Sequence, residues 1–410
     1  MKKLLQIALG VLTAIGGFVD IGDFVTSAVV GARFGMSLAW AILVGTLGIV
    51  VYAEMSGRVA ALTKRAVFDV VRERLGVRFA MANLFSAYFI NLLTLTAELA
   101  GVAIAIELAT SVNYLLWVPI VGLVVWLVVW KLPFEVMENA FGMLGLCLLV
   151  FIIALWQLGP DWSGMLDHAS HPTVPQGEGH PTWWYYAIGL FGAAMTPYEV
   201  FFFSSGAVEE RWGRQDLITN RLNVFVGFPL GAAISLSIMA CSALVLGPLH
   251  VEVSHVSQVG LPIALALGKL GVAAMLVGFF AATFGASLET LLSAGYTFAQ
   301  YFGWTWGKAA SRPREASRFQ TVLLISLFAA MALALTTIDP VKVTEYSVVL
   351  SAAALPLTYF PILVIANDRG YMGDKANGWF SNTIATGYLV IIVAVTLVTL
   401  PLMIATKAGM

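Results

Sequence analysis

Three acidic residues interrupt the long apolar stretches of this sequence. Asp20 and Asp23 stand in FVDIGDFV, residues 18–25, and Glu199 follows a proline in AAMTPYEV, residues 193–200. Carboxylate oxygens bind hard cations such as Mg²⁺, and they also cap the first turn of a helix. Which of these two roles applies depends on the elements that carry the three residues.

The composition is that of an integral membrane protein. Hydrophobic residues make up 60% of the 410-residue chain, charged residues make up 11%, and the mean hydropathy is +0.88. A soluble domain carries about 25% charged residues. Apolar runs of roughly 20 residues, the length that crosses a bilayer as a helix, recur along the whole chain. They predict eleven membrane-spanning helices, at about 5–36, 38–57, 80–109, 112–130, 138–158, 183–208, 218–246, 264–300, 319–337, 343–366 and 382–405.

The distribution of basic residues predicts the orientation of these helices. Loops on the cytoplasmic side of a membrane carry an excess of Lys and Arg. With the N-terminus inside, only four of the 22 Lys and Arg residues fall in outside segments, and these are Arg33, Lys269, Lys342 and Lys407. We therefore expect a multi-pass protein of the inner (plasma) membrane, with a cytoplasmic N-terminus and the C-terminus outside.

Cysteine and histidine give no sign of a disulfide or of a conventional zinc site. Cys147 and Cys241 both fall inside predicted spans, where small core residues are expected. The five histidines all fall in predicted outside loops, and their spacing matches no tetrahedral metal site. These histidines are His168, His171, His180, His250 and His255.

Two of the predicted spans are interrupted in the middle. Gly16, Gly17 and Gly22 weaken the first span beside its two acids, and Pro197 removes a backbone donor from the sixth. Broken helices are tolerated in a membrane only where they are buried or line a cavity. Each break lies in the first helix of a five-helix repeat, and the two repeats span about 5–158 and 183–366. Because five is an odd number, the second repeat must cross the membrane in the opposite sense to the first. An extra helix follows at about 382–405 in a single transmembrane domain, 1–410. Paired breaks of this kind indicate a substrate site at the midplane of a secondary transporter.

Helix capping is the competing explanation for the three acids. Thr196-Pro197-Tyr198-Glu199 has the pattern of a capping box, and Asp20 could cap the second half of the first span. Capping leaves Asp23 unexplained, because Ser or Thr would cap with a smaller desolvation cost. An ionised carboxylate near the bilayer centre costs several kcal/mol without a partner, so cation binding is favoured.

Four segments resemble the NRAMP family of divalent-metal transporters, in the same order along nearly the whole chain. DIGDFVTSAVVGARFGMSLAW at 20–40 is similar to the signature of that family's first helix, and AIGLFGAAMTPYEVFFFSS at 187–205 is similar to its sixth. TAELAGVAIAIEL at 96–108 and NDRGYMGDKANGW at 367–379 resemble the third helix and the loop before the eleventh. The resemblance implies a LeuT-like all-α fold, with two inverted five-helix repeats and an eleventh helix, and a metal site between broken helices one and six.

The resemblance also implies a ligand set, with informative departures. Asp20 falls on the family's metal-binding Asp, Asp23 on its metal-binding Asn, and Ala193 on the Ala that ligates through its carbonyl. Thr196 stands where the family places a ligating Met, and Glu199 follows closely. Losing a soft thioether and gaining carboxylates favours hard ions. The pattern is most similar to the NRAMP-related magnesium transporters, so we expect hydrated Mg²⁺ as the substrate, with Mn²⁺ second and Al³⁺ a further oxygen-ligand candidate.

The groups that carry protons in coupled family members are largely missing. Tyr198 stands at the family's His, and Leu95 replaces the Asp of a third-helix pair from which only Glu98 remains. Tyrosine titrates near pH 10 and is a poor relay at neutral pH. We therefore expect uncoupled uniport, and the alternative is a proton-coupled Mn²⁺/Fe²⁺ transporter of the usual family type. Tyr198, Glu98 and Glu289 are candidate pathway or gating residues, with an ordinary helix contact as the competing role for Glu98.

Other function classes fit less well. Three acids would repel the carboxylate of an organic substrate, and an enzyme would need a nucleophile–base pair or a His-based metal motif inside the membrane. A passive channel differs from a carrier in kinetics rather than in sequence. We expect a monomer in the lipid bilayer that contacts divalent metal ions as cargo, with no cofactor and no nucleic acid.

Overall fold

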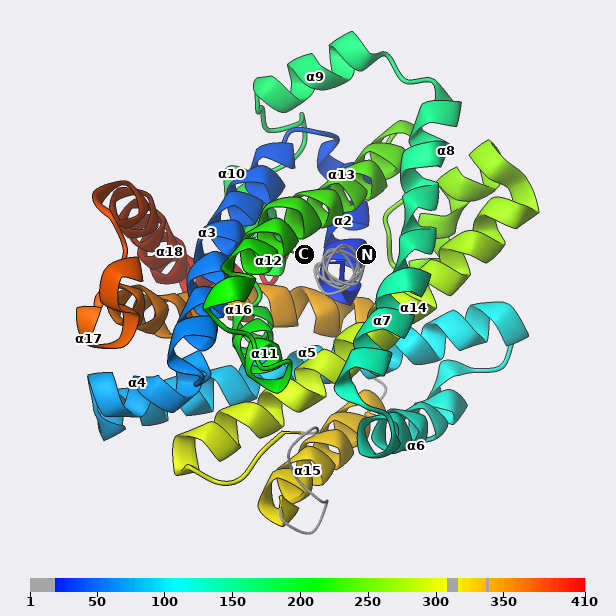
Figure 1. The fold of residues 1–410 in the computed structure, drawn as a ribbon. Helices are drawn as coiled ribbons and strands as arrows, with labels where there is room; N and C mark the ends of the chain where they lie inside the picture. The colour runs from blue at the N-terminus through cyan, green and yellow to red at the C-terminus, as the bar shows by residue number, and fades with distance from the viewer. Residues whose placement is uncertain (1–18, 308–315, 337–338, 410) are drawn as a thin grey trace.

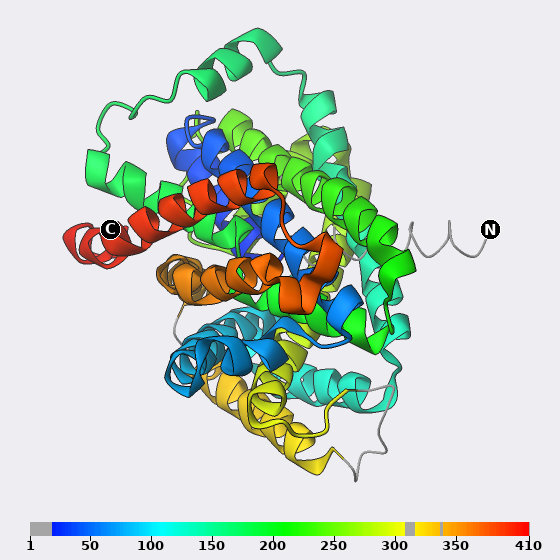
Figure 2. The same ribbon diagram turned by 60° about the vertical axis from the view of Figure 1, so that its left-hand side comes forward.

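The computed structural model describes residues 19–307, 316–336 and 339–409, and this part of the chain is helical without strands. Figures 1 and 2 show the bundle from two sides, with α9 lying apart from the other helices. The helices are α2 (Ile21–Phe34), α3 (Ala39–Thr63), α4 (Val67–Leu75), α5 (Val77–Thr110), α6 (Tyr114–Lys131), α7 (Phe134–Gly145), α8 (Val150–Leu158), α9 (Trp162–Ser170), α10 (His180–Ala194), α11 (Pro197–Glu209), α12 (Leu217–Leu222), α13 (Phe228–Val245), α14 (Leu261–Phe302), α15 (Ser317–Ala334), α16 (Pro340–Asn367), α17 (Arg369–Met372) and α18 (Trp379–Ala405).

The predicted spans match the helices closely. Ten helical segments of the described residues are long and apolar enough to cross a membrane, and each covers one predicted span from the second to the eleventh. The first predicted span is described only from residue 19 onward, and its earlier part, with Gly16 and Gly17, lies outside the described residues. The described part begins with α2, which at 14 residues is too short to cross a bilayer alone.

Close backbone contacts hold α2 and α10 in the middle of the bundle. A Cβ atom added to Gly31 of α2 would lie 2.1 Å from the carbonyl oxygen of Met239 on α13. A Cβ atom on Gly192 of α10 would lie 2.4 Å from the carbonyl oxygen of Val348 on α16. Small residues let membrane helices approach this closely, and dispersion forces then replace the hydrophobic driving force. The two broken helices are thereby fixed against α13 and α16.

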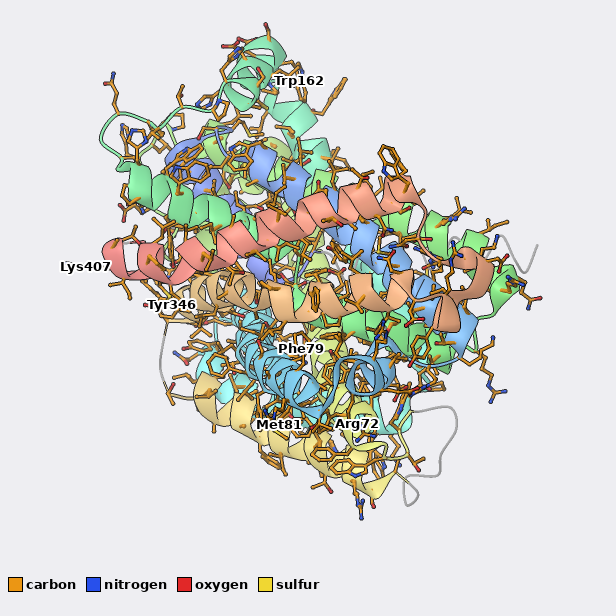
Figure 3. The ribbon with its side chains drawn as sticks, turned by 90° about the vertical axis from the view of Figure 1, so that its left-hand side faces the viewer. Arg72, Phe79, Met81, Trp162, Tyr346 and Lys407 are labelled. Carbon is orange, nitrogen blue, oxygen red and sulfur yellow. The ribbon has the colours of Figure 1, made fainter. Side chains whose placement is uncertain are left out.

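Ion pairs hold the segments between the spans. Arg65 pairs with Glu73 across α4, at 2.8 Å, and Arg74 pairs with Asp368 just before α17, at 2.6 Å. Figure 3 shows Arg72 of α4 well away from the end of the bundle where Tyr346 and Lys407 lie. The short helix α4 is not one of the membrane spans, and it packs its apolar side, including Phe68, into the protein.

We predict a pH-dependent contact at α4. Burial raises the pKa of the Asp69 carboxyl to about 6, although its hydrogen bond from the Ala66 amide and the nearby Arg65 oppose the shift. The folded form then holds the proton more tightly than the unfolded form, so this contribution to stability is complete below about pH 4 and is lost as the pH rises to about 6. Because the carboxyl is partly exposed, we expect amide protection in α4 to fall by no more than about tenfold over this range.

Hydrogen exchange, corrected for the intrinsic pH dependence of the amides, measures this effect. Asp69→Asn keeps the shape and cannot titrate, so its α4 amides should show equal protection at pH 4 and pH 6. A wild-type-like pH dependence in Asp69→Asn would show that another group is responsible.

Candidate metal site

The first break places Asp20 at the N-terminus of α2. Its carboxylate accepts a hydrogen bond from the Asp23 amide at 3.0 Å, so Asp20 is the N-cap of this helix. A Cβ atom added to Gly22 would lie 2.7 Å from Val348 Cγ1, so glycine is needed here for α16 to approach the first turn. The side chain of Asp20 is buried, with only 3% of the residue exposed. Capping therefore accounts for one carboxylate oxygen of Asp20.

The second break lies between α10, which ends at Ala194, and α11, which begins at Pro197. The predicted capping box is wrong, because the Thr196 side chain makes no hydrogen bond to the backbone of α11. Its hydroxyl donates instead to the Glu199 carboxylate, at 3.3 Å. The Glu199 side chain therefore points back toward the break. The carbonyl of Met195 is freed by the break and accepts a hydrogen bond from the Tyr359 hydroxyl of α16, at 3.1 Å.

Two side chains connect the breaks to each other and to α5. The Tyr198 hydroxyl of α11 donates to Asp20 Oδ2 at 3.2 Å, which joins the sixth span directly to the first. The Glu98 carboxylate of α5 accepts from the backbone amide of Ile21 at 3.1 Å, so this acid holds a donor at the start of α2. Glu98 is fully buried, and its second oxygen, Oε2, has no hydrogen-bond partner among the described residues.

A small cavity lies at this junction, and most of its surface is apolar. It contains about 210 Å³ of empty space. Apolar groups from Ile21, Gly22, Ala97 and Val348 form part of its surface. The lining residues with oxygen-bearing side chains are Asp20, Thr94, Thr196, Thr344, Ser347 and Ser351.

The remaining members of the predicted ligand set do not line this cavity. Asp23 is 1% exposed, and its side chain lies toward the Ser235 hydroxyl of α13. Ala193 is buried in the last turn of α10. In the described residues, no three His, Cys, Asp or Glu side chains are close enough to share a metal ion. The structure therefore brings Asp20 and Thr196 together, with Glu199 bound to Thr196, and leaves Asp23 turned away.

Met195 is the sulfur-containing residue at the second break, but its side chain does not line the cavity. A Cβ atom added to Gly48 of α3 would lie 2.6 Å from Met195 Sδ, so the thioether packs against the backbone of α3. Met195 is fully buried there and does not line the cavity beside Asp20. The replacement of the expected methionine by Thr196 is thus not compensated by the neighbouring sulfur in this conformation.

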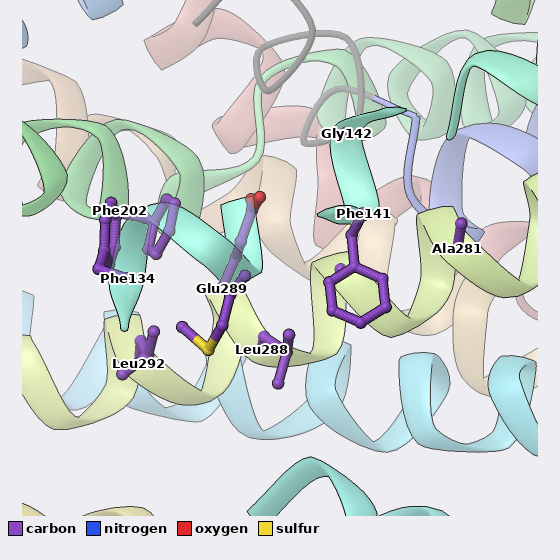
Figure 4. Close-up of a pocket in the computed structure, with 10 residues that line it drawn as sticks. Phe134, Phe141, Gly142, Phe202, Ala281, Leu288, Glu289 and Leu292 are labelled. Carbon is purple, nitrogen blue, oxygen red and sulfur yellow. The ribbon is translucent and has the colours of Figure 1, made fainter. Parts of the chain in front are cut away.

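Glu289 lies in a different cavity. This cavity contains about 400 Å³ of empty space between α7, α11 and α14 and is mostly apolar. Figure 4 shows Glu289 between Phe134 and Phe202 on one side and Phe141 on the other. Glu289 therefore lines a different cavity from Asp20, and its predicted place on an aqueous path stays a prediction.

A family model described as Natural resistance-associated macrophage protein-like, or Nramp, matches residues 10–401. The chain belongs to this family. Members of the Nramp family are membrane transporters, so the protein is a transporter and not an enzyme, as the sequence predicted. The match covers both broken spans and every other element that builds the junction.

Curated Nramp relatives resemble this chain over almost its whole length. A protein named divalent metal cation transporter MntH from Acidiphilium cryptum is 24% identical, over 93% of this chain and 87% of the relative. A protein of the same name from Deinococcus radiodurans is also 24% identical, over 91% of this chain and 84% of the relative.

Solved structures share the fold. The manganese transporter of Eremococcus coleocola, crystallised with an aromatic bis-isothiourea compound, superimposes with a TM-score of 0.72 at 18% identity, covering 98% of this chain and 87% of that one. A Na⁺-coupled sialic acid symporter superimposes with a TM-score of 0.61 at 13% identity, covering 96% of this chain and 89% of that one. The predicted LeuT-like all-helical fold is confirmed by these matches.

Sequence reasoning missed several polar groups around the two breaks. Tyr359 satisfies the carbonyl at the second break, and Thr344, Ser347 and Ser351 line the cavity from α16. Their spacing of three and four residues places these three hydroxyls on one face of a helix. That spacing, within an otherwise apolar span, is the signal that could have identified them.

Proposed function

We propose that this Nramp-family chain carries hydrated divalent cations, Mg²⁺ first and Mn²⁺ second, into the cell by uncoupled uniport. The proposal includes a plasma-membrane location with the N-terminus in the cytoplasm and the C-terminus outside, as the distribution of Lys and Arg favours. Relatives named divalent metal cation transporters support divalent metals as the cargo class. The metal is transported substrate rather than a resident cofactor.

One observation carries the choice of a hard ion. The cavity beside Asp20 offers carboxylate and hydroxyl oxygens, while the sulfur of Met195 packs against Gly48. Thioether ligands select softer transition metals, whereas oxygen ligands and retained waters suit Mg²⁺ and Mn²⁺. Because the polar side chains in this lining all present oxygen, the site favours the hard ions.

The proposed ligands are Asp20, Asp23, Glu199, Thr196 and the carbonyl of Ala193. Two of these, Asp20 and Thr196, line the cavity, and Glu199 is one hydrogen bond from Thr196. Asp23 would join them by a side-chain rotation away from Ser235 of α13. Coordination would give its buried carboxylate a cationic partner, which offsets part of the desolvation cost of that carboxylate.

Ion competition in proteoliposomes tests the choice of substrate. With Mg²⁺ uptake as the signal, we expect Mn²⁺ to compete at comparable concentrations and Fe²⁺ and Ca²⁺ to compete poorly. Preferred entry of Fe²⁺, without competition by Mg²⁺, would contradict the proposal.

We predict that Mg²⁺ entry is not accompanied by protons. Tyr198 stands at the position of the family's His, and its hydroxyl donates a hydrogen bond to Asp20. The five histidines of the chain lie in α9, in loops or at the first residue of α10. An inside-negative potential supplies about 4.6 kcal/mol per 100 mV for a divalent ion, so inward transport needs no proton gradient. Liposomes loaded with a pH dye should take up Mg²⁺ without acidification, while a proton ionophore added afterwards verifies that the dye responds.

A second candidate is a proton-coupled Mn²⁺/Fe²⁺ transporter. It is favoured by the contact of Glu98 with the Ile21 amide, because this contact places a buried acid from α5 directly at the start of α2. Metal-driven acidification in the wild-type protein that disappears in Glu98→Gln would establish this alternative and refute uniport.

A further inference from the structure

The cavity beside Asp20 is lined by two chemically different groups of polar residues. Asp20 and Thr196, at the helix breaks, belong to the proposed metal ligands. The other polar lining residues carry neutral hydroxyls, on two helices that supply none of those ligands. We call these residues the hydroxyl wall, and they are Thr94 of α5 and Thr344, Ser347 and Ser351 of α16.

All four residues of the hydroxyl wall are buried, with exposed fractions of 4% or less. The hydroxyls of Thr94 and Ser347 are 2.9 Å apart and hydrogen-bond each other across the contact between α5 and α16. Thr344 donates to the carbonyl of Pro340 in its own helix, at 2.8 Å. Each of these three hydroxyl oxygens retains lone-pair capacity toward the cavity, because a hydroxyl can donate once and accept twice.

Ser351 differs from the other three. Its hydroxyl is 1% exposed and has no hydrogen-bond partner within the described residues, although it lines the cavity. A buried hydroxyl without a partner costs about 1–3 kcal/mol, and alanine would avoid this cost at the same position. The serine therefore points to a polar ligand, such as water, that enters the cavity during function.

The chemistry of the wall suits bound water rather than bare metal. A water held by a dication is a strong hydrogen-bond donor, and neutral hydroxyl oxygens accept such bonds without adding charge. Mg²⁺ loses its waters reluctantly and usually keeps several when one or two carboxylates hold it. A carboxylate and several neutral acceptors around one cavity match an ion that is bound directly by Asp20 and keeps part of its water shell.

We infer that Thr94, Ser347 and Ser351 receive the retained water shell of the transported ion and thereby set the preference for hydrated Mg²⁺. This inference rests on the proposed function, because it assigns further residues of the same site. The residues of the hydroxyl wall contact the bound waters, whereas the acids bind the metal ion directly. They are specificity-determining residues that discriminate between ions by how firmly those ions keep their water.

Isosteric variants test the role of the wall. Thr94→Val and Ser351→Ala remove a hydroxyl with little change in volume, and the double variant removes both. Thr96→Val is the matched control, since Thr96 is a buried threonine of α5 whose hydroxyl bonds to the carbonyl of Leu92, at 2.7 Å, and does not line the cavity. Initial uptake rates of Mg²⁺ and Mn²⁺ in proteoliposomes give a KM for each ion, and thermal stability in detergent verifies folding.

We expect the double variant to raise the KM for Mg²⁺ by about tenfold or more, which corresponds to one or two lost hydrogen bonds. The KM for Mn²⁺, which gives up its waters more readily, should change less than about threefold on the same scale. Thr96→Val should leave both values unchanged.

Two outcomes would overturn the inference while leaving the proposed function intact. One is a folded double variant with wild-type KM values for both ions, and the other is an equal rise for Mg²⁺ and Mn²⁺, which would mean that the wall only shapes the cavity. Failure of the proposed function looks different, because the wild-type protein itself would then not carry Mg²⁺.

Discussion

Asp20→Ala is expected to abolish divalent-cation uptake. Among the described residues, Asp20 is the acid that lines the cavity between the two breaks, where it also accepts a hydrogen bond from the Tyr198 hydroxyl. Removing one partner of a buried charge pair costs about 3–5 kcal/mol, and the ion is the other partner here. That loss corresponds to a fall in uptake of about 100-fold or more at subsaturating metal. Radiotracer uptake or a metal-sensitive dye in proteoliposomes measures it.

A matched variant separates charge from structure. Asn at position 20 keeps the N-cap of α2 and an acceptor for Tyr198, because asparagine caps helices about as well as aspartate. Asp20→Asn should therefore retain the thermal stability of the wild type and still lose uptake. Asp167→Ala, on the exposed helix α9, should change neither property. Near-normal uptake by a stable Asp20→Asn protein would exclude Asp20 as a charged ligand.

Thr196→Met should reverse the ion preference. The substitution places a thioether at the second break and removes the hydrogen bond from Thr196 to Glu199. Because sulfur favours softer metals, we expect the KM for Mg²⁺ to rise by about tenfold or more, while Cd²⁺ becomes a strong competitor. Competition of Cd²⁺ against Mg²⁺ and Mn²⁺ uptake measures the change.

Met195→Leu is the control for this experiment. It removes the sulfur that packs against Gly48, at a volume close to that of the original side chain. Its ion preference should equal that of the wild type. A change in preference in Met195→Leu, with none in Thr196→Met, would mean that Met195 and not position 196 faces the ion.

The spans and both breaks could be predicted because hydrocarbon imposes strict rules on sequence. A helix must be apolar over about 20 residues, and polar or proline-containing interruptions must have a local reason. Asp20 and Pro197 met this criterion, and the structure places them at the start of α2 and of α11. The resemblance to the Nramp family rested on the same two segments, and the family match extends over residues 10–401.

Side-chain directions at the breaks could not be predicted in the same way. The pattern at Thr196 fits a capping box, yet its hydroxyl bonds to Glu199, because the partner of a side chain depends on tertiary contacts and not on spacing alone. Asp23 is three residues from Asp20 and lies toward α13, outside the cavity. The hydroxyls of α16 were overlooked because serine and threonine are common in membrane helices and attract attention only once a cavity is seen beside them.

The contact at Gly31 restricts how the protein can move. The carbonyl of Met239 occupies the position that any side chain at residue 31 would take, so α2 and α13 touch backbone to backbone. The two helices belong to different halves of the chain, and we expect this contact to make them move together. A rearrangement that tilts the part of α2 near Asp20 must then move α13 together with α2. The opening that admits an ion therefore has to form between other helices of the bundle.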